Sequence, residues 1–153
     1  MTGVQTCALP ISIPVEVKAY ITGKVTEVIP NEGVVIETYA SFVQGIFGIG
    51  GETSGELVIA TPDNHTILSD DLINESMKDK IIVGGSIVTA KAMKRAGEVG
   101  VRGIIVGGFD DQDLRDILGY DIGVAITGSE DIPSTLVVTE GFGEINIDRK
   151  SVV

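Results

Sequence analysis

The sequence predicts an α+β to α/β fold, in which an N-terminal antiparallel β-hairpin module precedes a small, mostly parallel βαβαβ sheet. Two observations support this prediction. Apolar runs rich in β-branched residues end in Gly-Gly at 81–85 and 104–108, as buried parallel strands tend to do. Between them, apolar residues recur at three- and four-residue steps over 89–99, which indicates an amphipathic helix. A crossover of this kind is right-handed.

The N-terminal part of the sequence carries strand signals. Apolar and polar residues alternate over 15–22, which predicts a half-buried strand. Two further apolar runs, at 25–29 and 34–36, flank the turn sequence Pro-Asn-Glu-Gly and predict an antiparallel hairpin. The pattern over 20–38 resembles the hairpins of biotinyl- and lipoyl-type and related barrel-sandwich domains. Carriers of that group present a lysine at the hairpin tip, and this tip has none, so a swinging-arm role is not expected.

The densest run of glycines lies at 45–55. Gly48 and Gly50 match the first half of a dinucleotide-binding fingerprint, but Thr53 stands where the third glycine is needed, and a strand pattern follows over 55–60 instead of a helix. We therefore interpret this run as a bulged, glycine-rich β-turn region.

The C-terminal part continues the alternation of helices and strands. Ser69 is expected to cap a short helix over 70–77. Asp110 is expected to cap a further helix, closed by Gly119, whose apolar stripe comprises Leu114, Ile117 and Leu118. Third and fourth strands of the sheet are predicted at 123–126 and 135–138.

Composition excludes several functions. The net charge of −11 over 153 residues repels phosphate backbones, so nucleic acid is not an expected partner. No apolar run reaches the length that a bilayer requires, so we expect no membrane span. Cys7 is the only cysteine, which argues against thiolate metal sites, and we predict no metal centre. His65 is the only histidine, and its turn-like surroundings favour a solvated loop residue over a catalytic base.

The two ends of the chain resemble translated sequencing-adapter sequence. Residues 1–11 and 148–153 both back-translate to common adapter strings, in frame at each junction. We therefore expect both segments to be non-native and the rest to be a piece of a longer protein. On this basis the predicted organisation is a β-rich module over 12–62 and a small α/β domain over 63–147, between the two adapter-derived segments.

A site is expected at the carboxyl edge of the sheet, because ligands of open α/β sheets bind outside the strand ends. Gly84 and Gly85 directly precede the predicted helix, so their amides could hold a phosphate or carboxylate; alternatively they only permit a tight turn. Asp110 likewise has a sufficient role as a helix cap. The candidate ligand-binding residues are Gly84, Gly85, Ser86, Gly107, Gly108, Asp110, Thr127, Gly128 and Glu140. No catalytic residue is identified.

Four motifs support a family resemblance: FVQGIFGIGGE at 42–52, GGSIVT at 84–89, LGYDIGVAITG at 118–128 and TEGFG at 139–143. With them, the chain resembles a family of uncharacterised prokaryotic proteins that have barrel-sandwich-like N-terminal lobes. The resemblance implies that this chain is the C-terminal part of such a protein, without its N-terminal portion and its last strand region. It brings no activity with it.

Two functions remain. The first is a non-catalytic structural or binding module of a longer cytoplasmic protein, with the rest of its own chain, or further copies in a homo-oligomer, as partner. The second is an enzyme or small-molecule-binding domain for a phosphate- or carboxylate-bearing ligand at the glycine-rich edge, contacted by Ser86, Thr127 and Glu140. The absence of a committed nucleophile or base in the sequence favours the first.

Overall fold

The computed structural model describes residues 16–118 and 132–148 and divides the chain into two compact units, 1–38 and 39–153. The first unit contains an antiparallel hairpin, and the second contains a mixed sheet in which most strands are parallel. This arrangement confirms the predicted fold class. Of the predicted adapter segments, 1–11 lies outside the described residues, as does all of 148–153 except Asp148.

The hairpin of the first unit pairs β1 (Lys24–Ile29) with β2 (Gly33–Glu37), as predicted. The strand predicted over 15–22 was wrong for its described residues, which form no strand because no neighbouring strand pairs with them. Apolar side chains of the hairpin are strongly exposed, with Val25 at 50% and Val28 at 67%. An isolated two-stranded hairpin is marginally stable in water, so this unit depends on further contacts for stability.

The boundary between the two units lies near residue 38, and not at residue 62 as predicted. The reason is that β3 (Phe47–Ile49) and β4 (Leu57–Ile59) both pair into the sheet of the second unit. The strand expected over 55–60 is confirmed as β4. The sequence did not reveal β3, because glycines interrupt its apolar pattern.

The sheet of the second unit has the strand order β3-β8-β7-β5-β4, and β6 pairs with β7 beside this path. Strands β4, β5, β7 and β8 are mutually parallel, whereas β3 runs antiparallel to β8. The predicted strand over 123–126 lies outside the described residues. The remaining strands are β5 (Ile81–Val83), β6 (Ile87–Val88), β7 (Gly103–Phe109) and β8 (Thr135–Phe142).

The predicted amphipathic helix is α1 (Ala90–Val99). It begins after Thr89, whose hydroxyl oxygen accepts a hydrogen bond from the backbone N–H of Ala92 at 3.2 Å. It ends at Gly100, which takes the left-handed conformation with φ 84°. The residues of the expected stripe that are buried are Ala92, Met93, Ala96 and Val99.

The helix predicted over 70–77 is replaced by two 3₁₀ turns, η1 (Asp70–Leu72) and η2 (Glu75–Met77). Ser69 does not cap; its hydroxyl donates to the carboxylate of Asp71. Between the turns, Ile73 is extended and only 3% exposed. The backbone leaves the helical path at Ile73, and the second turn starts from a new cap at Asn74.

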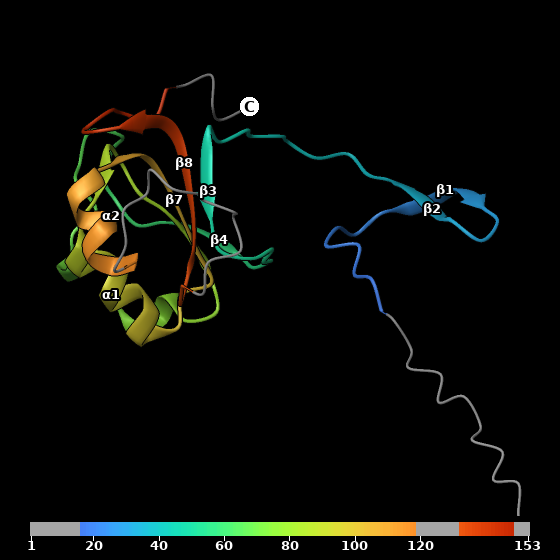
Figure 1. Ribbon diagram of the computed structural model, residues 1–153, viewed down its shortest axis with the longest axis horizontal. Coiled ribbons are helices and arrows are strands. Elements are labelled where there is room, and N and C mark those ends of the chain that lie inside the picture. The colour runs from blue at the N-terminus through green and yellow to red at the C-terminus, as the bar shows by residue number, and fades with distance from the viewer. Residues whose placement is uncertain (1–15, 119–131, 149–153) are drawn as a thin grey trace, which may run out of the picture. The chain divides into compact units, whose positions relative to one another are not determined.

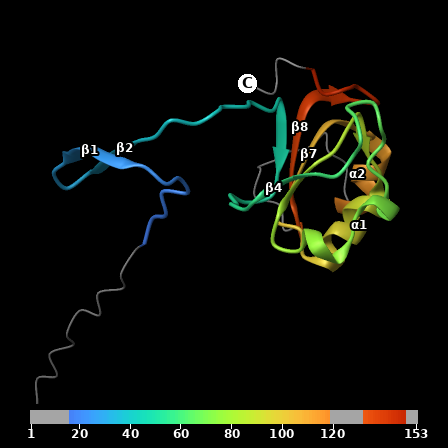
Figure 2. The ribbon, with the colours of Figure 1, turned by 180° about the vertical axis from the view of Figure 1, so that it is seen from behind.

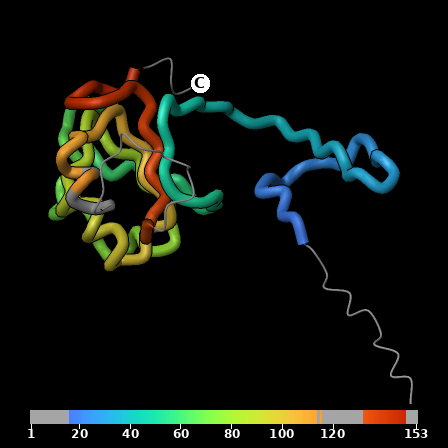
Figure 3. The backbone as a smooth tube through the Cα atoms, viewed as in Figure 1, coloured from blue at the N-terminus to red at the C-terminus, as the bar shows by residue number. Residues whose placement is uncertain are grey.

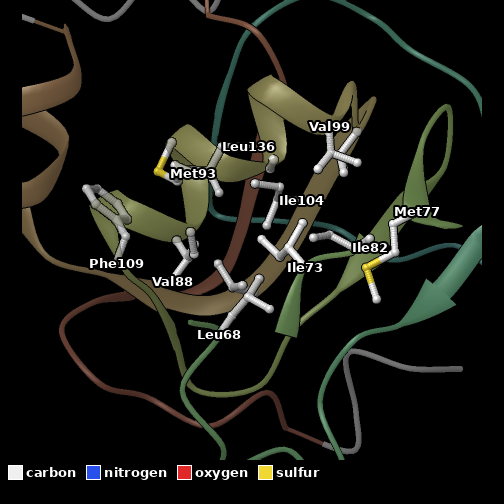
Figure 4. Packing of buried hydrophobic residues seen from close by; sticks show 14 of the residues in the cluster. Leu68, Ile73, Met77, Ile82, Val88, Met93, Val99, Ile104, Phe109 and Leu136 are labelled. Atoms are coloured by element: carbon white, nitrogen blue, oxygen red, sulfur yellow. The ribbon is translucent and has the colours of Figure 1, made fainter. Parts of the chain in front are cut away.

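Both helices cover the same face of the sheet (Figures 1 and 2). This follows from the topology, because parallel strands added in one direction through right-handed crossovers place every connection on one side. The core lies on that face, where side chains from η2, α1 and the strands pack together (Figure 4). Members of this cluster with 1% exposure or less include Leu68, Ile82, Val88, Ile104 and Leu136. Within the described part of the chain, no helix combines the length and apolar character required to cross a membrane.

Candidate functional site

The carboxyl ends of β5, β7 and β8 meet at one end of the sheet, as their parallel register requires. Two segments of the chain close this end. One is the loop over 61–68, and the other is the chain after β8, over 143–147, which turns back across the sheet (Figure 3). The candidate residues at this edge therefore meet other parts of the protein itself.

The Gly-Gly-Ser segment does not lead into a helix, and this part of the prediction was wrong. The β-branched pair of β6 follows it and runs parallel to β7 before α1 begins. Two of the three amides of the segment are already used, because Gly84 N–H donates to Ile105 O at 2.8 Å and Ser86 N–H donates to Thr66 O at 3.2 Å. These two amides are not available to bind an anion.

Ser86 is a structural residue in this arrangement. Its side chain is fully buried, and its hydroxyl donates to the backbone carbonyl of His65 at 2.8 Å. The side chain of His65 is exposed, in agreement with its interpretation as a loop histidine. The hydroxyl of Ser86 thus holds the 61–68 loop in place.

Three of the candidate glycines allow chain segments to approach closely. A Cβ atom on Gly85 would overlap the carbonyl oxygen of Thr66, and Cβ atoms on Gly107 and Gly108 would overlap the carbonyl oxygens of Ile145 and Gly143. Only glycine lacks the atom that would collide. The space outside these three residues is occupied by backbone, which leaves no room for a ligand there.

The 61–68 loop is organised by Asp63. Its Oδ1 atom accepts hydrogen bonds from the backbone N–H of His65 at 3.0 Å, and from the backbone N–H and hydroxyl of Thr66, both at 2.8 Å. The hydroxyl bond, followed by the two amide bonds, lowers the pKa of Asp63 below its ordinary value, because each bond stabilises the ionised carboxylate. The exposed carboxylate therefore works as a turn former.

The segment after β8 forms hydrogen bonds with the 61–68 loop and with β8 itself. The Asn64 side chain donates from Nδ2 to the carbonyl oxygen of Ile147 at 3.0 Å, and Ile147 is 7% exposed. Glu140, another candidate residue, is half-buried, and its Oε1 atom accepts from the backbone N–H of Asp148 at 3.1 Å. Thr127 and Gly128 lie outside the described residues.

Asp110 acts as the predicted cap of α2 (Asp111–Leu118). Its Oδ1 atom accepts from the backbone N–H of Gln112 at 2.8 Å and from that of Asp113 at 3.4 Å. Its side chain is exposed and lies at the start of the helix. The role of a cap is thus sufficient to explain this aspartate.

Aromatic rings add to the closure of the edge. Phe109, at the end of β7, is 2% exposed and lies with its ring centroid 5.4 Å from that of Phe47 and 4.9 Å from that of Phe142. Stacked and tilted ring pairs at these separations are favourable beyond the area they bury. Across 16–118 and 132–148, moreover, no three acidic, histidine or cysteine side chains gather in a way that could hold a metal ion.

A groove that the sequence did not reveal runs along α1. It has a volume of about 650 Å³ and lies between the helix and the chain that enters β8. Its apolar lining comes from Met93, Ile104, Ile132 and Pro133, and the two lysines of the helix, Lys91 and Lys94, also line it. No periodicity could predict it, because its walls come from segments about thirty residues apart in the sequence.

The face of the sheet opposite the helices is also apolar. Val58 packs into the core, so its neighbours Leu57 and Ile59 point to the other side, where they are 63% and 77% exposed. On the neighbouring strand β5, Ile81 pairs with Leu57 and Val83 pairs with Ile59. These two partly buried side chains continue the apolar rows of this face. Towards β8 this face is partly covered, because the chain at 45 lies against Val137.

These features define a small α/β sheet module with a closed carboxyl edge, one helix-covered face and one apolar face that is open at β4. Comparison of the chain with protein-family models, with curated proteins and with solved structures found no match.

Proposed function

We propose that this chain is a non-catalytic structural or binding module of a longer cytoplasmic protein, of the prokaryotic family that its motifs resemble. The observation that supports this proposal best is the closure of the carboxyl edge. Gly85, Gly107 and Gly108 meet backbone carbonyl oxygens, and the hydroxyl of Ser86 holds a loop. The place where a sheet of this class binds its substrate is thus used for internal packing.

The open sheet face indicates how such a module would bind. Parallel sheets are normally covered on both faces, because their strands are apolar on both sides. Here the side chains of Leu57 and Ile59 remain largely exposed. We propose that the rest of its own longer chain supplies the second layer, since the apolar rows on β4 and β5 match what a packed layer requires.

The proposal is tested by ligand-induced thermal shift on this chain, with nucleotides and sugar phosphates as probes. We expect no rise in Tm with any of them, because a ligand stabilises only a protein that binds it. Backbone amide chemical shifts of Gly84, Ser86 and Gly108 serve as a local readout. A concentration-dependent Tm rise accompanied by shifts at these amides would overturn the proposal in favour of a ligand-binding domain at the glycine-rich edge.

A further inference from the structure

The groove along α1 combines an apolar lining with an excess of positive charge. Met93 and Ile104 are core residues that also line the groove, and Ile132 and Pro133 form the opposite wall. Its volume of about 650 Å³ lies within the range of pockets that bind small molecules, roughly 300–1,000 Å³. The groove is therefore large enough for an apolar ligand body.

The charged side chains that line the groove differ in whether they form ion pairs. Glu98 lines the groove but lies 3.8 Å from Arg95, which also pairs with Glu75 at 2.8 Å. Lys91 and Lys94, by contrast, are exposed and form no ion pair within the described part of the chain. What distinguishes these two lysines from other exposed lysines such as Lys18 and Lys78 is that both line the groove, three residues apart on α1.

One more acidic group lies near the groove. Asp113 accepts a hydrogen bond from the backbone N–H of Ala90, the residue at one end of the groove, and its charge is thereby directed at the amino end of α1. This carboxylate complements the positive end of the helix dipole and leaves the two lysines unpaired. Among the described residues at the groove, the local excess of charge is therefore positive.

From this arrangement we infer that the groove binds a small amphiphilic anion, with an apolar body against Met93, Ile132 and Pro133 and a carboxylate or phosphate group between Lys91 and Lys94. Apolar contact supplies most of the affinity, and the two ammonium groups select for charge. The inference goes beyond the proposed function and does not depend on it, because the groove is separate from the closed carboxyl edge.

The test uses decanoate as the probe, with decanol and acetate as controls that carry only the apolar body or only the charge. We expect saturable amide shifts confined to 90–98 and 132–134 with decanoate, and binding about tenfold weaker or more with either control. A parallel titration with decyl phosphate distinguishes the two head groups, and tighter binding of either one supports the inference.

Two double variants isolate the role of the lysines. Lys91→Gln with Lys94→Gln is expected to weaken decanoate binding by about tenfold, which corresponds to about 1.4 kcal/mol. The matched control, Lys18→Gln with Lys78→Gln, makes the same change in net charge at exposed lysines that do not line the groove, and should bind as the unmodified chain does. Equal affinity in both double variants, or no saturable shift at the groove, would overturn the inference. These outcomes are independent of the thermal-shift result with nucleotides and sugar phosphates.

Discussion

The Oδ2 atom of Asp113 in α2 accepts a hydrogen bond from the backbone N–H of Ala90, the first residue of α1, at 3.0 Å. The first amides of a helix have no partner within the helix itself. Thr89 satisfies one of them from the cap position, and Asp113 satisfies another from a different helix. A hydrogen bond between the first residue of α1 and a side chain of α2 thus joins the two helices.

Replacement of Asp113 by alanine should therefore destabilise the second unit by about 1 kcal/mol, the usual cost of losing a helix cap. Asp113→Asn should cost less, because the amide oxygen still accepts the bond while the interaction with the helix dipole is lost. Urea denaturation measures both changes. Glu144→Gln, at an exposed carboxylate, is the matched control and should remain within about 0.5 kcal/mol of the unmodified chain. An alanine variant as stable as this control would contradict the role given to Asp113.

Gly85→Ala should destabilise the fold by about 3 kcal/mol, because its Cβ atom would displace the Thr66 carbonyl and with it the loop held by Ser86. Chemical denaturation provides the measurement. Gly51→Ala is the appropriate comparison, since a Cβ atom there meets nothing within 4 Å, and it should change stability by less than about 0.5 kcal/mol. Similar stabilities for the two variants would show that the loop does not press on the edge as described.

The 61–68 loop should loosen in acid. The pKa of Asp63 is lower in the folded chain than in the unfolded chain, so its contribution to stability is complete above the unfolded pKa of about 3.9 and is lost as the pH falls through the folded value. The stability difference between the unmodified chain and Asp63→Asn should consequently stay constant above about pH 5 and shrink as the pH falls below about 4, through the folded pKa. Urea titrations at several pH values measure it, and a difference that stays constant with pH would rule out this role.

Leu57→Lys combined with Ile59→Lys should leave the fold nearly as stable as before, because both side chains are already largely exposed. The double variant should, however, bind less of an environment-sensitive hydrophobic dye and self-associate less in sedimentation velocity. Val17→Lys with Val28→Lys changes two exposed valines of the first unit and controls for net charge.

In the longer protein, amides of β4 should exchange slowly if the rest of the chain covers this face. Rapid exchange there, with dimers that the double variant abolishes, would identify a second copy as the partner.

Local signals in the sequence were sufficient to predict the elements whose formation does not depend on a distant segment of the chain. The strand, helix and strand from 81 to 109, the stop at Gly100 and the cap at Asp110 all follow from periodicity and end residues. The errors arose where a distant segment decides the outcome. β3 forms because β8 pairs with it, and Ile73 interrupts a helix because the core takes its side chain.

The same distinction explains the candidate site. Gly-Gly at the end of a strand is equally suited to holding an anion and to packing against another chain segment, and the sequence around Gly85 and Gly107 does not distinguish the two. The decision rests on the carbonyl groups of Thr66, which is 19 residues from Gly85, and of Ile145, which is 38 residues from Gly107. The groove was missed for a related reason, because Lys94 and Pro133, which both line it, come from distant parts of the sequence.

The pairing of β3 with β8 also affects how the protein is made. Strand β8 lies between β7 and β3, yet it follows all the other described strands in the sequence, so β3 has no neighbour in the sheet until β8 has left the ribosome. Pairings between such distant positions form slowly and leave apolar strands exposed in the meantime. We therefore expect productive folding of the nascent chain to begin with β5, α1 and β7, and the edge strand β3 to join only after β8 has been synthesised.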